Sequence, residues 1–298
     1  MSWQEKYKDK ICTAQEAVAH VQSGDKVIFG DWLGEPPALV DALIARAEEL
    51  VDVEIIHGMS PGPVPGVDPK YQGHFHHTSM FIGPNTRQAY RDKRVTYVGG
   101  TTFHKWPEMF AKSKILNPHW AFVQVSTPDE NGMCSYGVDC SFTEPAVRTA
   151  APGKVVVQVN PSFPKLGGTM LDLSQADYIV CQESPLYTIG RAVVDEKIQR
   201  IANYCSSLIE DGSTIQLGIG ALPDAIARNL TDKKDLGVHS ETLTEAMMEL
   251  VQAGVITNAK KTLNKGVCIG AQLAGSEQFY RRDGWITFKL KQDRIKGV

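Results

Sequence analysis

Short apolar runs rich in β-branched residues alternate with segments of helical period along most of the chain, and this alternation is what most limits its fold. Buried parallel strands have this composition because helices cover both faces of their sheet. The sequence therefore predicts an α/β fold with parallel sheets. The clearest strand candidates are residues 26–30, 53–56, 95–98, 121–125 and 155–159.

Helix starts between these runs carry recognisable signals. Thr13 and Glu16 have the spacing of a capping box, so a helix is expected to begin after Thr13. Pro36 stands where the first turn of a helix tolerates proline, and an apolar stripe follows it over residues 39–50. With the strand candidates on either side, this second helix completes a β-α-β unit.

A domain boundary is expected near residues 182–186, where the alternation is interrupted. A chain of 298 residues also favours two domains over one. We predict an N-terminal α/β domain over residues 1–186 and a second α/β domain over residues 187–298. The second domain is expected to open with a long helix over about 190–210.

The elements expected after this helix form a shorter series than those of the first domain. It comprises a strand at 214–217, a helix at 222–230, a strand and loop at 236–241, a helix at 242–253 and a strand at 267–273. Residues 281–296 are highly charged and show no strand–helix alternation, so an altered end is expected there.

The charge balance excludes several classes of partner. Lysine and arginine number 31 against 34 acidic residues, so the formal net charge is −3. No broad basic surface for nucleic acid or anionic lipid is implied. The N-terminus lacks the apolar run of a signal peptide, and no stretch is long and apolar enough to span a bilayer. We therefore expect a cytoplasmic protein without nucleic-acid or membrane partners.

Cysteine and histidine placement does not favour a metal site. The six cysteines are scattered without a C-x-x-C pair, which is typical of reduced, buried thiols. No H-E-x-x-H motif accompanies the histidines, so no bound metal is expected. Gly73 and Thr78 suggest that some of these histidines lie in a loop. The histidines concerned are His74, His76, His77 and His104.

Residues 218–225, with the sequence GIGALPDA, follow a predicted strand and open a predicted helix. Glycine allows a close approach to the backbone, and the amides of Gly218 and Gly220 at a helix N-terminus are suited to a phosphate or an oxyanion. The alternative is a tight strand-to-helix turn without a ligand. Pro223 and the missing third glycine exclude a dinucleotide-binding fingerprint.

Residues 237–241, with the sequence GVHSE, end another predicted strand at the sheet edge where open α/β folds bind ligands. Glu241 is therefore a candidate catalytic carboxylate, and Ser240 beside it is a substrate-side candidate. The alternative is that Ser240 and Glu241 cap an exposed helix over residues 242–253.

These two motifs together resemble the acetyl-CoA hydrolase and CoA-transferase family, most nearly its 4-hydroxybutyrate and butyrate CoA-transferases. The resemblance extends from about residue 5 to residue 280. Several motifs in the same order make it more specific than either motif alone. The additional motifs are residues 81–87, 125–137, 159–165 and 254–262.

The resemblance implies two open α/β/α domains of the CoA-transferase type with the active site between them. It also implies coenzyme A as substrate and product, a short-chain acyl-CoA, a small carboxylic acid such as acetate, and a homo-oligomer, with a dimer favoured. Glu241 matches the family nucleophile, which forms an acyl-glutamyl anhydride and then a glutamyl-CoA thioester. Gly218, Gly220 and Pro223 match the oxyanion or CoA-binding loop.

Other candidates stay open at this point. Arg87 is a candidate for holding a substrate carboxylate, because its planar guanidinium group matches that geometry, or it is a surface helix residue. Asn160 either shapes the acyl pocket or marks a plain turn. Lys260 and Lys261 either pair with CoA phosphates or form a solvated face.

Relatives of this family run beyond 298 residues, so the second domain is expected to be incomplete relative to theirs. An incomplete sheet leaves unpaired strand edges. Three functions therefore follow from the sequence: a CoA-transferase, an acyl-CoA hydrolase on the same fold, and a catalytically impaired fragment that binds CoA. The two enzymes differ only in the access of water to the acylated glutamate.

Overall fold

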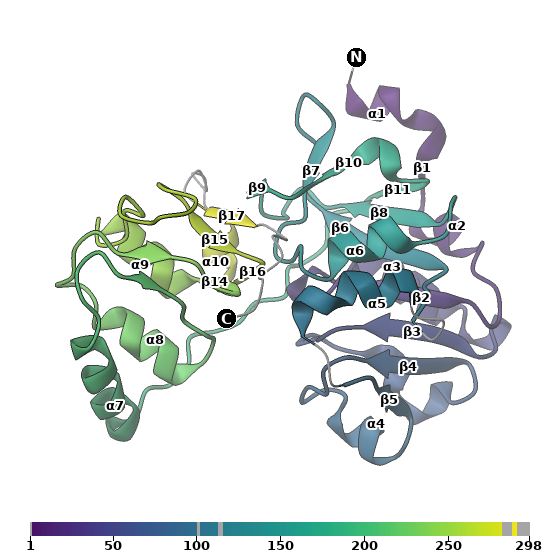
Figure 1. Cartoon of the computed structure of the whole chain (residues 1–298). Coiled ribbons are helices and arrows are strands. Elements are labelled where there is room, and N and C mark those ends of the chain that lie inside the picture. The colour runs from purple at the N-terminus through teal and green to yellow at the C-terminus, as the bar shows by residue number, and fades with distance from the viewer. Residues whose placement is uncertain (1, 100–101, 113–115, 282–287, 291–298) are drawn as a thin grey trace. The chain divides into compact units, whose positions relative to one another are not determined.

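The computed structural model describes residues 2–99, 102–112, 116–281 and 288–290. The chain divides into two compact units, one formed by Met1–Lys165 and Met170–Tyr187 and the other by Leu166–Thr169 and Thr188–Lys291. Each unit combines helices with parallel strands (Figure 1). The expected α/β class is confirmed.

The first unit is built on an eight-stranded sheet in which every neighbouring pair of strands is parallel. The strand order is β1-β11-β8-β6-β2-β3-β4-β5. A small antiparallel pair joins β7 (Met133–Ser135) to β10 (Met170–Asp172). The eight strands are β1 (Ile11–Cys12), β2 (Lys26–Phe29), β3 (Val53–His57), β4 (Phe75–Ser79), β5 (Val95–Tyr97), β6 (Trp120–Val125), β8 (Val155–Val159) and β11 (Tyr178–Cys181).

Helices cover both faces of this sheet, which is why its central strands are apolar at successive positions. On one face, α2 (Ala14–Val18) and α3 (Pro37–Ala45) pack against alternate strand residues such as Val27 and Phe122. On the other face, α5 (Trp106–Lys112) and α6 (Thr143–Thr149) pack against the intervening residues such as Ile28. Figure 1 shows this three-layer arrangement. The short helices α1 (Trp3–Lys6) and α4 (Arg87–Arg91) complete the set of α-helices described in this unit.

The chain reverses its direction across the sheet at β2. From β2 it proceeds through β3 and β4 to β5 on one side, and then returns to β6 on the other side. The carboxyl ends of β2 and β6 therefore form a topological switch point, where open α/β sheets bind ligands. Trp32 lies just after β2 with a φ of 58°, which is the left-handed region, and it is buried. Such backbone strain is characteristic of functional sites.

Local sequence signals account for several of these elements. The capping box predicted at Thr13 is present, since Thr13 Oγ1 accepts from Glu16 N and Glu16 Oε2 accepts from Thr13 N. The helix predicted after Pro36 is α3, with Pro37 in its first turn. The loop expected around His76, His77 and Thr78 is wrong, because these residues form β4. Four of the five residues of β4 are polar, so the search for apolar strands did not detect it.

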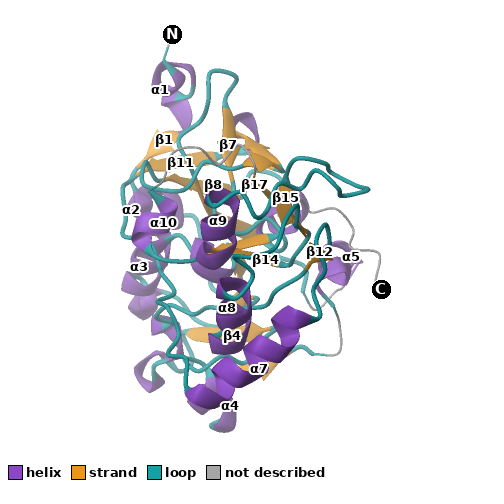
Figure 2. Ribbon diagram, turned by 90° about the vertical axis from the view of Figure 1, so that its left-hand side faces the viewer, coloured by secondary structure: helices purple, strands orange, loops and turns teal. Residues whose placement is uncertain are grey.

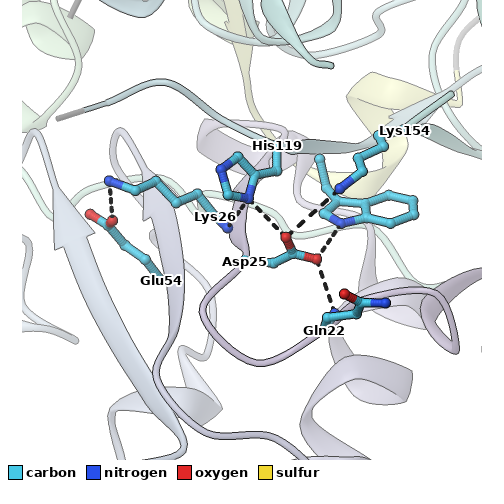
Figure 3. A network of polar contacts seen from close by, with 7 residues as sticks. Gln22, Asp25, Lys26, Glu54, His119 and Lys154 are labelled. Carbon is cyan, nitrogen blue, oxygen red and sulfur yellow. Dashed lines mark hydrogen bonds and ion pairs between the residues drawn. The ribbon is translucent and has the colours of Figure 1, made fainter. Parts of the chain in front are cut away.

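Asp25 is the centre of a polar network at the amino ends of β2, β6 and β8 (Figure 3). Its Oδ2 accepts from Gln22 N at 3.0 Å and from Trp120 Nε1 at 2.8 Å. Its Oδ1 lies 2.8 Å from His119 Nδ1 and 3.7 Å from Lys154 Nζ. Burial opposes ionisation of Asp25, but these hydrogen bonds and Lys154 outweigh it and hold its pKa below the usual value.

Replacing Asp25 by alanine is expected to lower the free energy of unfolding by about 2–3 kcal/mol, since the buried indole N–H of Trp120 and the backbone N–H of Gln22 then lose a charged acceptor. Because the pKa of Asp25 is lowered in the folded state, its stabilising contribution is present at neutral pH and is lost as the pH falls through that lowered value. Urea unfolding at pH 7 measures the change. Glu130→Gln, at an exposed position, is the control, and an equal loss in both variants would contradict the assignment.

The second unit contains short parallel strands with helices α7 (Glu196–Ser207), α8 (Ala221–Arg228), α9 (Glu245–Gln252) and α10 (Glu277–Tyr280). In Figure 2, α7, α8 and α9 follow one another along the unit. β12 (Thr214–Ile215) pairs with β13 (Gly237–Val238), and β14 (Thr242–Thr244) pairs with β16 (Gln272–Ala274). β15 (Cys268–Gly270), β17 (Phe288–Leu290) and β9 (Gly167–Gly168) form a three-stranded parallel sheet.

Three expectations for this unit need correction. The helix expected over 190–210 begins only at Glu196. The helix expected over 242–253 begins at Glu245, because residues 242–244 pair with β16 as strand β14. Within the charged stretch 281–296, residues 288–290 form strand β17, whereas residues 282–287 and 291–298 lie outside the described part of the chain. In the described ranges, no helix has the length and apolar character needed to cross a membrane.

Candidate active site

Glu241 lies three residues beyond the end of β13, in the bend that precedes β14. Its side chain is partly buried. Its backbone carbonyl accepts from Ala271 N at 2.8 Å and from Gln272 N at 2.9 Å, which fixes this residue against the start of β16. The helix-cap alternative is wrong, because Glu241 precedes a strand and the N-cap of α9 is Thr244.

The glycine motif connects β12 to α8. Gly220 is the N-cap of α8, with a φ of 118° that L-residues rarely adopt, and no side chain caps this helix. The first amides of a helix have no acceptor within the helix, so they are available to a negatively charged ligand. Pro223 lies in the first turn, where its missing N–H costs no helical hydrogen bond.

Ser240 connects the two motifs directly. Its Oγ donates to Leu217 O at 2.9 Å, and Leu217 immediately precedes Gly218. Its backbone N–H donates to Ile269 O at 2.9 Å. Ser240 is buried, so its hydroxyl serves to hold the glycine loop beside the loop that carries Glu241. The structure thus places Ser240, Glu241 and Gly218 on adjoining loops at one edge of the strands.

A pocket of about 100 Å³ lies beside the glycine loop. Arg191 reaches its wall, and its guanidinium group pairs with Glu249 and lies 3.7 Å from Glu245. These partners raise the pKa of Arg191 further above its usual value. Glu241 lies in the bend before β14 and does not line the pocket. Its lining residues are Ile189, Gly190, Arg191, Ala192, Gly218, Ile219, Gly220, Asp224, Thr244, Glu245, Ala246, Ala274 and Gly275.

Arg87 and Asn160 belong to the first unit and lie in different environments there. Arg87 is exposed at the start of α4. Asn160 is fully buried after β8, where its Nδ2 donates to Gln124 Oε1 at 2.8 Å and to Ser184 O at 2.9 Å. Its Oδ1 accepts from Ser162 N at 3.0 Å. The side chain of Asn160 is therefore occupied in holding the loops at the carboxyl edge of the sheet.

The two adjacent lysines differ from each other. Lys260 is exposed, and its Nζ lies 3.4 Å from the carboxylate of Asp235. Lys261 is 3 % exposed, and its Nζ donates to Val238 O at 2.7 Å and to Val267 O at 2.8 Å. Neither alternative from the sequence describes Lys261, which is neither a solvated residue nor available to a CoA phosphate.

Sequence reasoning missed a cluster of buried titratable residues, which lie after β2, at the end of β3 and within β4. Burial raises the pKa of Glu35 to about 8, although Ser60 Oγ donates to its carboxylate at 2.8 Å and opposes that shift. Burial lowers the pKa of His57 to about 4 and also lowers that of His77. The two imidazole rings meet edge to face at 5.5 Å beside a cavity of about 10 Å³. Acidic residues directly after a predicted strand were the available signal.

Within the described ranges, no three His, Cys, Asp or Glu side chains are arranged to hold a metal ion. Coenzyme A is the group that the family resemblance implies, and the glycine motif has features suited to such a ligand. An uncapped helix N-terminus, an open Gly220 and an adjacent pocket suit a ligand with anionic and extended parts.

Comparisons with known proteins show which sequences and structures this chain resembles. The chain is 40% identical over 281 residues to the 4-hydroxybutyrate coenzyme A transferase of Clostridium kluyveri, covering 94% of this chain and 65% of the relative. The crystal structure of RipA from Yersinia pestis matches with a TM-score of 0.90 at 28% identity, over 98% of this chain and 70% of that chain. A 4-hydroxybutyrate CoA-transferase structure from Porphyromonas gingivalis matches with a TM-score of 0.83 at 31% identity, again over 98% and 70%.

The chain spans slightly less than two thirds of the length of two of the curated relatives that it matches, 65% for the Clostridium kluyveri enzyme and 63% for a second. The second of these is the succinyl-CoA:cyclohexane-1-carboxylate CoA transferase of Geobacter metallireducens. The sequence pattern of the acetyl-CoA hydrolase/transferase N-terminal domain matches residues 1–189, which is more than half of the chain. With the fold shared over nearly its whole length, the chain belongs to the acetyl-CoA hydrolase/transferase family.

Proposed function

We propose that this protein transfers coenzyme A between a short-chain acyl-CoA and a carboxylic acid such as acetate, with Glu241 as the covalent nucleophile. The observation that carries the proposal is the hydrogen bond from Ser240 to Leu217, which holds the Glu241 loop beside the glycine motif. The names of the relatives, which are CoA-transferases, support the same reaction class. Candidate acyl groups are 4-hydroxybutyryl, butyryl and acetyl.

In the first half of the reaction, a carboxylate oxygen of Glu241 attacks the thioester carbonyl carbon, the C–S bond breaks, and CoA leaves as a thiolate. The product is an acyl-glutamyl anhydride. The thiolate then attacks the glutamyl carbonyl carbon and releases the original acyl group as its carboxylate, which leaves a glutamyl-CoA thioester. The incoming carboxylate reverses these two steps and restores Glu241.

A carboxylate is a weak nucleophile, so this chemistry depends on orientation and on charge stabilisation at the reacting carbonyl. The hydrogen bonds of Glu241 O to Ala271 and Gln272 supply a fixed backbone for the carboxylate. The amides around Gly218 and Gly220, at the uncapped N-terminus of α8, supply donors for a developing oxyanion or for CoA itself. Arg87 stays a candidate for the substrate carboxylate, and we assign Asn160 a positioning role.

An exchange assay tests the reaction class. With butyryl-CoA and acetate, the proposal predicts equal amounts of acetyl-CoA and butyrate, with parallel double-reciprocal plots that indicate a ping-pong sequence. Release of free CoA thiol without acetyl-CoA would identify a hydrolase on the same intermediates. The proposed function is wrong if 4-hydroxybutyryl-CoA and butyryl-CoA yield neither acetyl-CoA nor free CoA with acetate, and acetyl-CoA yields neither butyryl-CoA nor free CoA with butyrate.

Gly220→Ala is expected to raise the KM for acyl-CoA by about tenfold or more, because a side chain at a φ of 118° forces the loop to change shape. Gly153→Ala is the matched control. Gly153 also has a positive φ, 80°, and open space around the position of its missing Cβ, but it lies in the turn before β8. Steady-state kinetics give the KM for acyl-CoA of both variants. Equal KM values would contradict a ligand role for the glycine loop.

A further inference from the structure

Strand β13, which leads to Glu241, is paired differently on its two sides. On one side it pairs regularly with β12, where Gly237 N donates to Ser213 O at 2.9 Å and His239 N donates to Ile215 O at 3.1 Å. On the other side, pairing with β15 begins only at His239, which forms a parallel bridge with Ile269. At Val238, one residue earlier, two side chains take the place of a neighbouring strand.

These side chains are Asn258 and Lys261, which we call the 258/261 wedge. Asn258 Oδ1 accepts from Val238 N at 2.9 Å. Lys261 Nζ donates to Val238 O at 2.7 Å and to Val267 O at 2.8 Å, so it bridges β13 to the residue just before β15. Asn258 is 1 % exposed and Lys261 is 3 % exposed. The wedge therefore satisfies both backbone groups of Val238 inside the protein.

The sequence is adapted to this wedge at several positions. Asn258 has a φ of 58°, a conformation that asparagine tolerates better than most residues. Its Nδ2 also contacts Cys268 Sγ at 3.3 Å, which anchors it to β15. Gly237 leaves room for the lysine stem, because a Cβ there would lie 2.5 Å from Lys261 Cγ. Glycine in the GVHSE motif is thus explained by the passage of Lys261 across β13.

The position of Glu241 depends on where the wedge ends. Beyond Val238, the chain pairs with β15 through the hydrogen bond from Ser240 N to Ile269 O. The next contacts are those from Ala271 N and Gln272 N to Glu241 O. A shift in the register between β13 and β15 would therefore move Glu241 relative to β16, since each step along a strand reverses the side chain.

We propose that Asn258 and Lys261 are positioning residues, which set the register between β13 and β15 and thereby hold Glu241 in its reactive place. The proposal rests on the proposed function of Glu241 for its catalytic consequence, although the structural consequence stands by itself. A buried lysine is a costly way to join two carbonyl groups. Its fixed amine nevertheless bridges two strands at one point and so selects one register.

Lys261→Met tests the wedge, because methionine keeps an unbranched stem and removes the three donors of the amine. Amide hydrogen exchange is measured at Ser240, Ala271 and Gln272. We expect exchange at these three amides to become at least tenfold faster, relative to amides in α7 of the same protein. For catalysis, we expect kcat of CoA exchange to fall by about ten- to a hundredfold with little change in KM.

Leu250→Ala is the matched control, since Leu250 is buried in α9 of the same unit and takes no part in the hydrogen bonds of the wedge. The proposal is overturned if Leu250→Ala accelerates exchange at the three amides as much as Lys261→Met does, or if Lys261→Met leaves their protection unchanged. Asn258→Ala, which removes one acceptor, serves in the same comparison if Lys261→Met does not fold. A protein without transferase activity would refute the proposed function, while the exchange data would still decide the wedge.

Discussion

Glu241→Gln is expected to lower kcat for CoA exchange by about a thousandfold or more, because an amide oxygen cannot attack the thioester and form the anhydride. Glutamine has nearly the same size and keeps the backbone contacts of Glu241 O with Ala271 and Gln272. The variant should therefore fold normally and bind acyl-CoA with an affinity near that of the unchanged protein. Exchange between butyryl-CoA and acetate, with isothermal titration of CoA in parallel, measures both quantities.

Glu277→Gln is the control for this variant, since Glu277 lies in α10 of the same unit and pairs with Arg281 at an exposed position. It should leave kcat within about twofold, because an exposed ion pair contributes little. Activity that survives undiminished in Glu241→Gln would show that another group carries the acyl chain. Circular dichroism checks that Glu241→Gln is folded. If this variant does not fold, the activity of Glu241→Asp is compared with that of the unchanged protein instead.

Glu35→Gln is expected to remove a strong pH dependence from the stability of the first unit. Burial raises the folded-state pKa of Glu35 to about 8 from an unfolded value of 4.5. Glu35 thus stabilises the fold when protonated, below about pH 4.5, and this contribution is lost as the pH rises to about 8. At about 1.4 kcal/mol per pH unit, the free energy of unfolding of the unchanged protein should fall relative to Glu35→Gln by up to about 5 kcal/mol across this window.

Urea unfolding of both proteins from pH 5 to pH 8.5 measures this difference. The two buried histidines are present in both proteins, so their contribution cancels in the difference. The charge of Glu35 also raises the pKa of Asp31, so the difference reports Glu35 together with its effect on Asp31. Glu130→Gln, at an exposed position, should follow the unchanged protein at every pH. Parallel pH profiles for the unchanged protein and Glu35→Gln would show that Glu35 is ionised in the folded state.

Much of the fold was predictable because its strands are buried on both faces. The runs at 26–30, 121–125 and 155–159 correspond to β2, β6 and β8. A short, continuously apolar run is typical of a parallel strand that helices cover on both faces. Local signals also held where they depend on neighbouring residues alone, as at the capping box of Thr13. The resemblance to the acetyl-CoA hydrolase/transferase family supplied what these patterns could not.

The rest required contacts between distant parts of the sequence. Residues 242–244 have a helical neighbourhood, yet they form β14 because β16, some thirty residues later, offers a partner. The burial of Glu35, His57 and His77 could not be predicted from the sequence, since it depends on the packing of β2, β3 and β4. The sequence suggests a surface or phosphate-binding role for Lys261. Its actual partners, the carbonyl groups of Val238 and Val267, are brought to it only by the fold.

The most direct test of the account is peptide mass spectrometry of the protein after incubation with butyryl-CoA and rapid quenching in acid. We expect a glutamyl-CoA thioester on the peptide that contains Glu241, which hydroxylamine converts to a hydroxamate and which added acetate removes. Glu241→Gln should carry no adduct. A CoA or acyl adduct on any other residue, with Glu241 unmodified, would contradict the assignment of Glu241 as nucleophile.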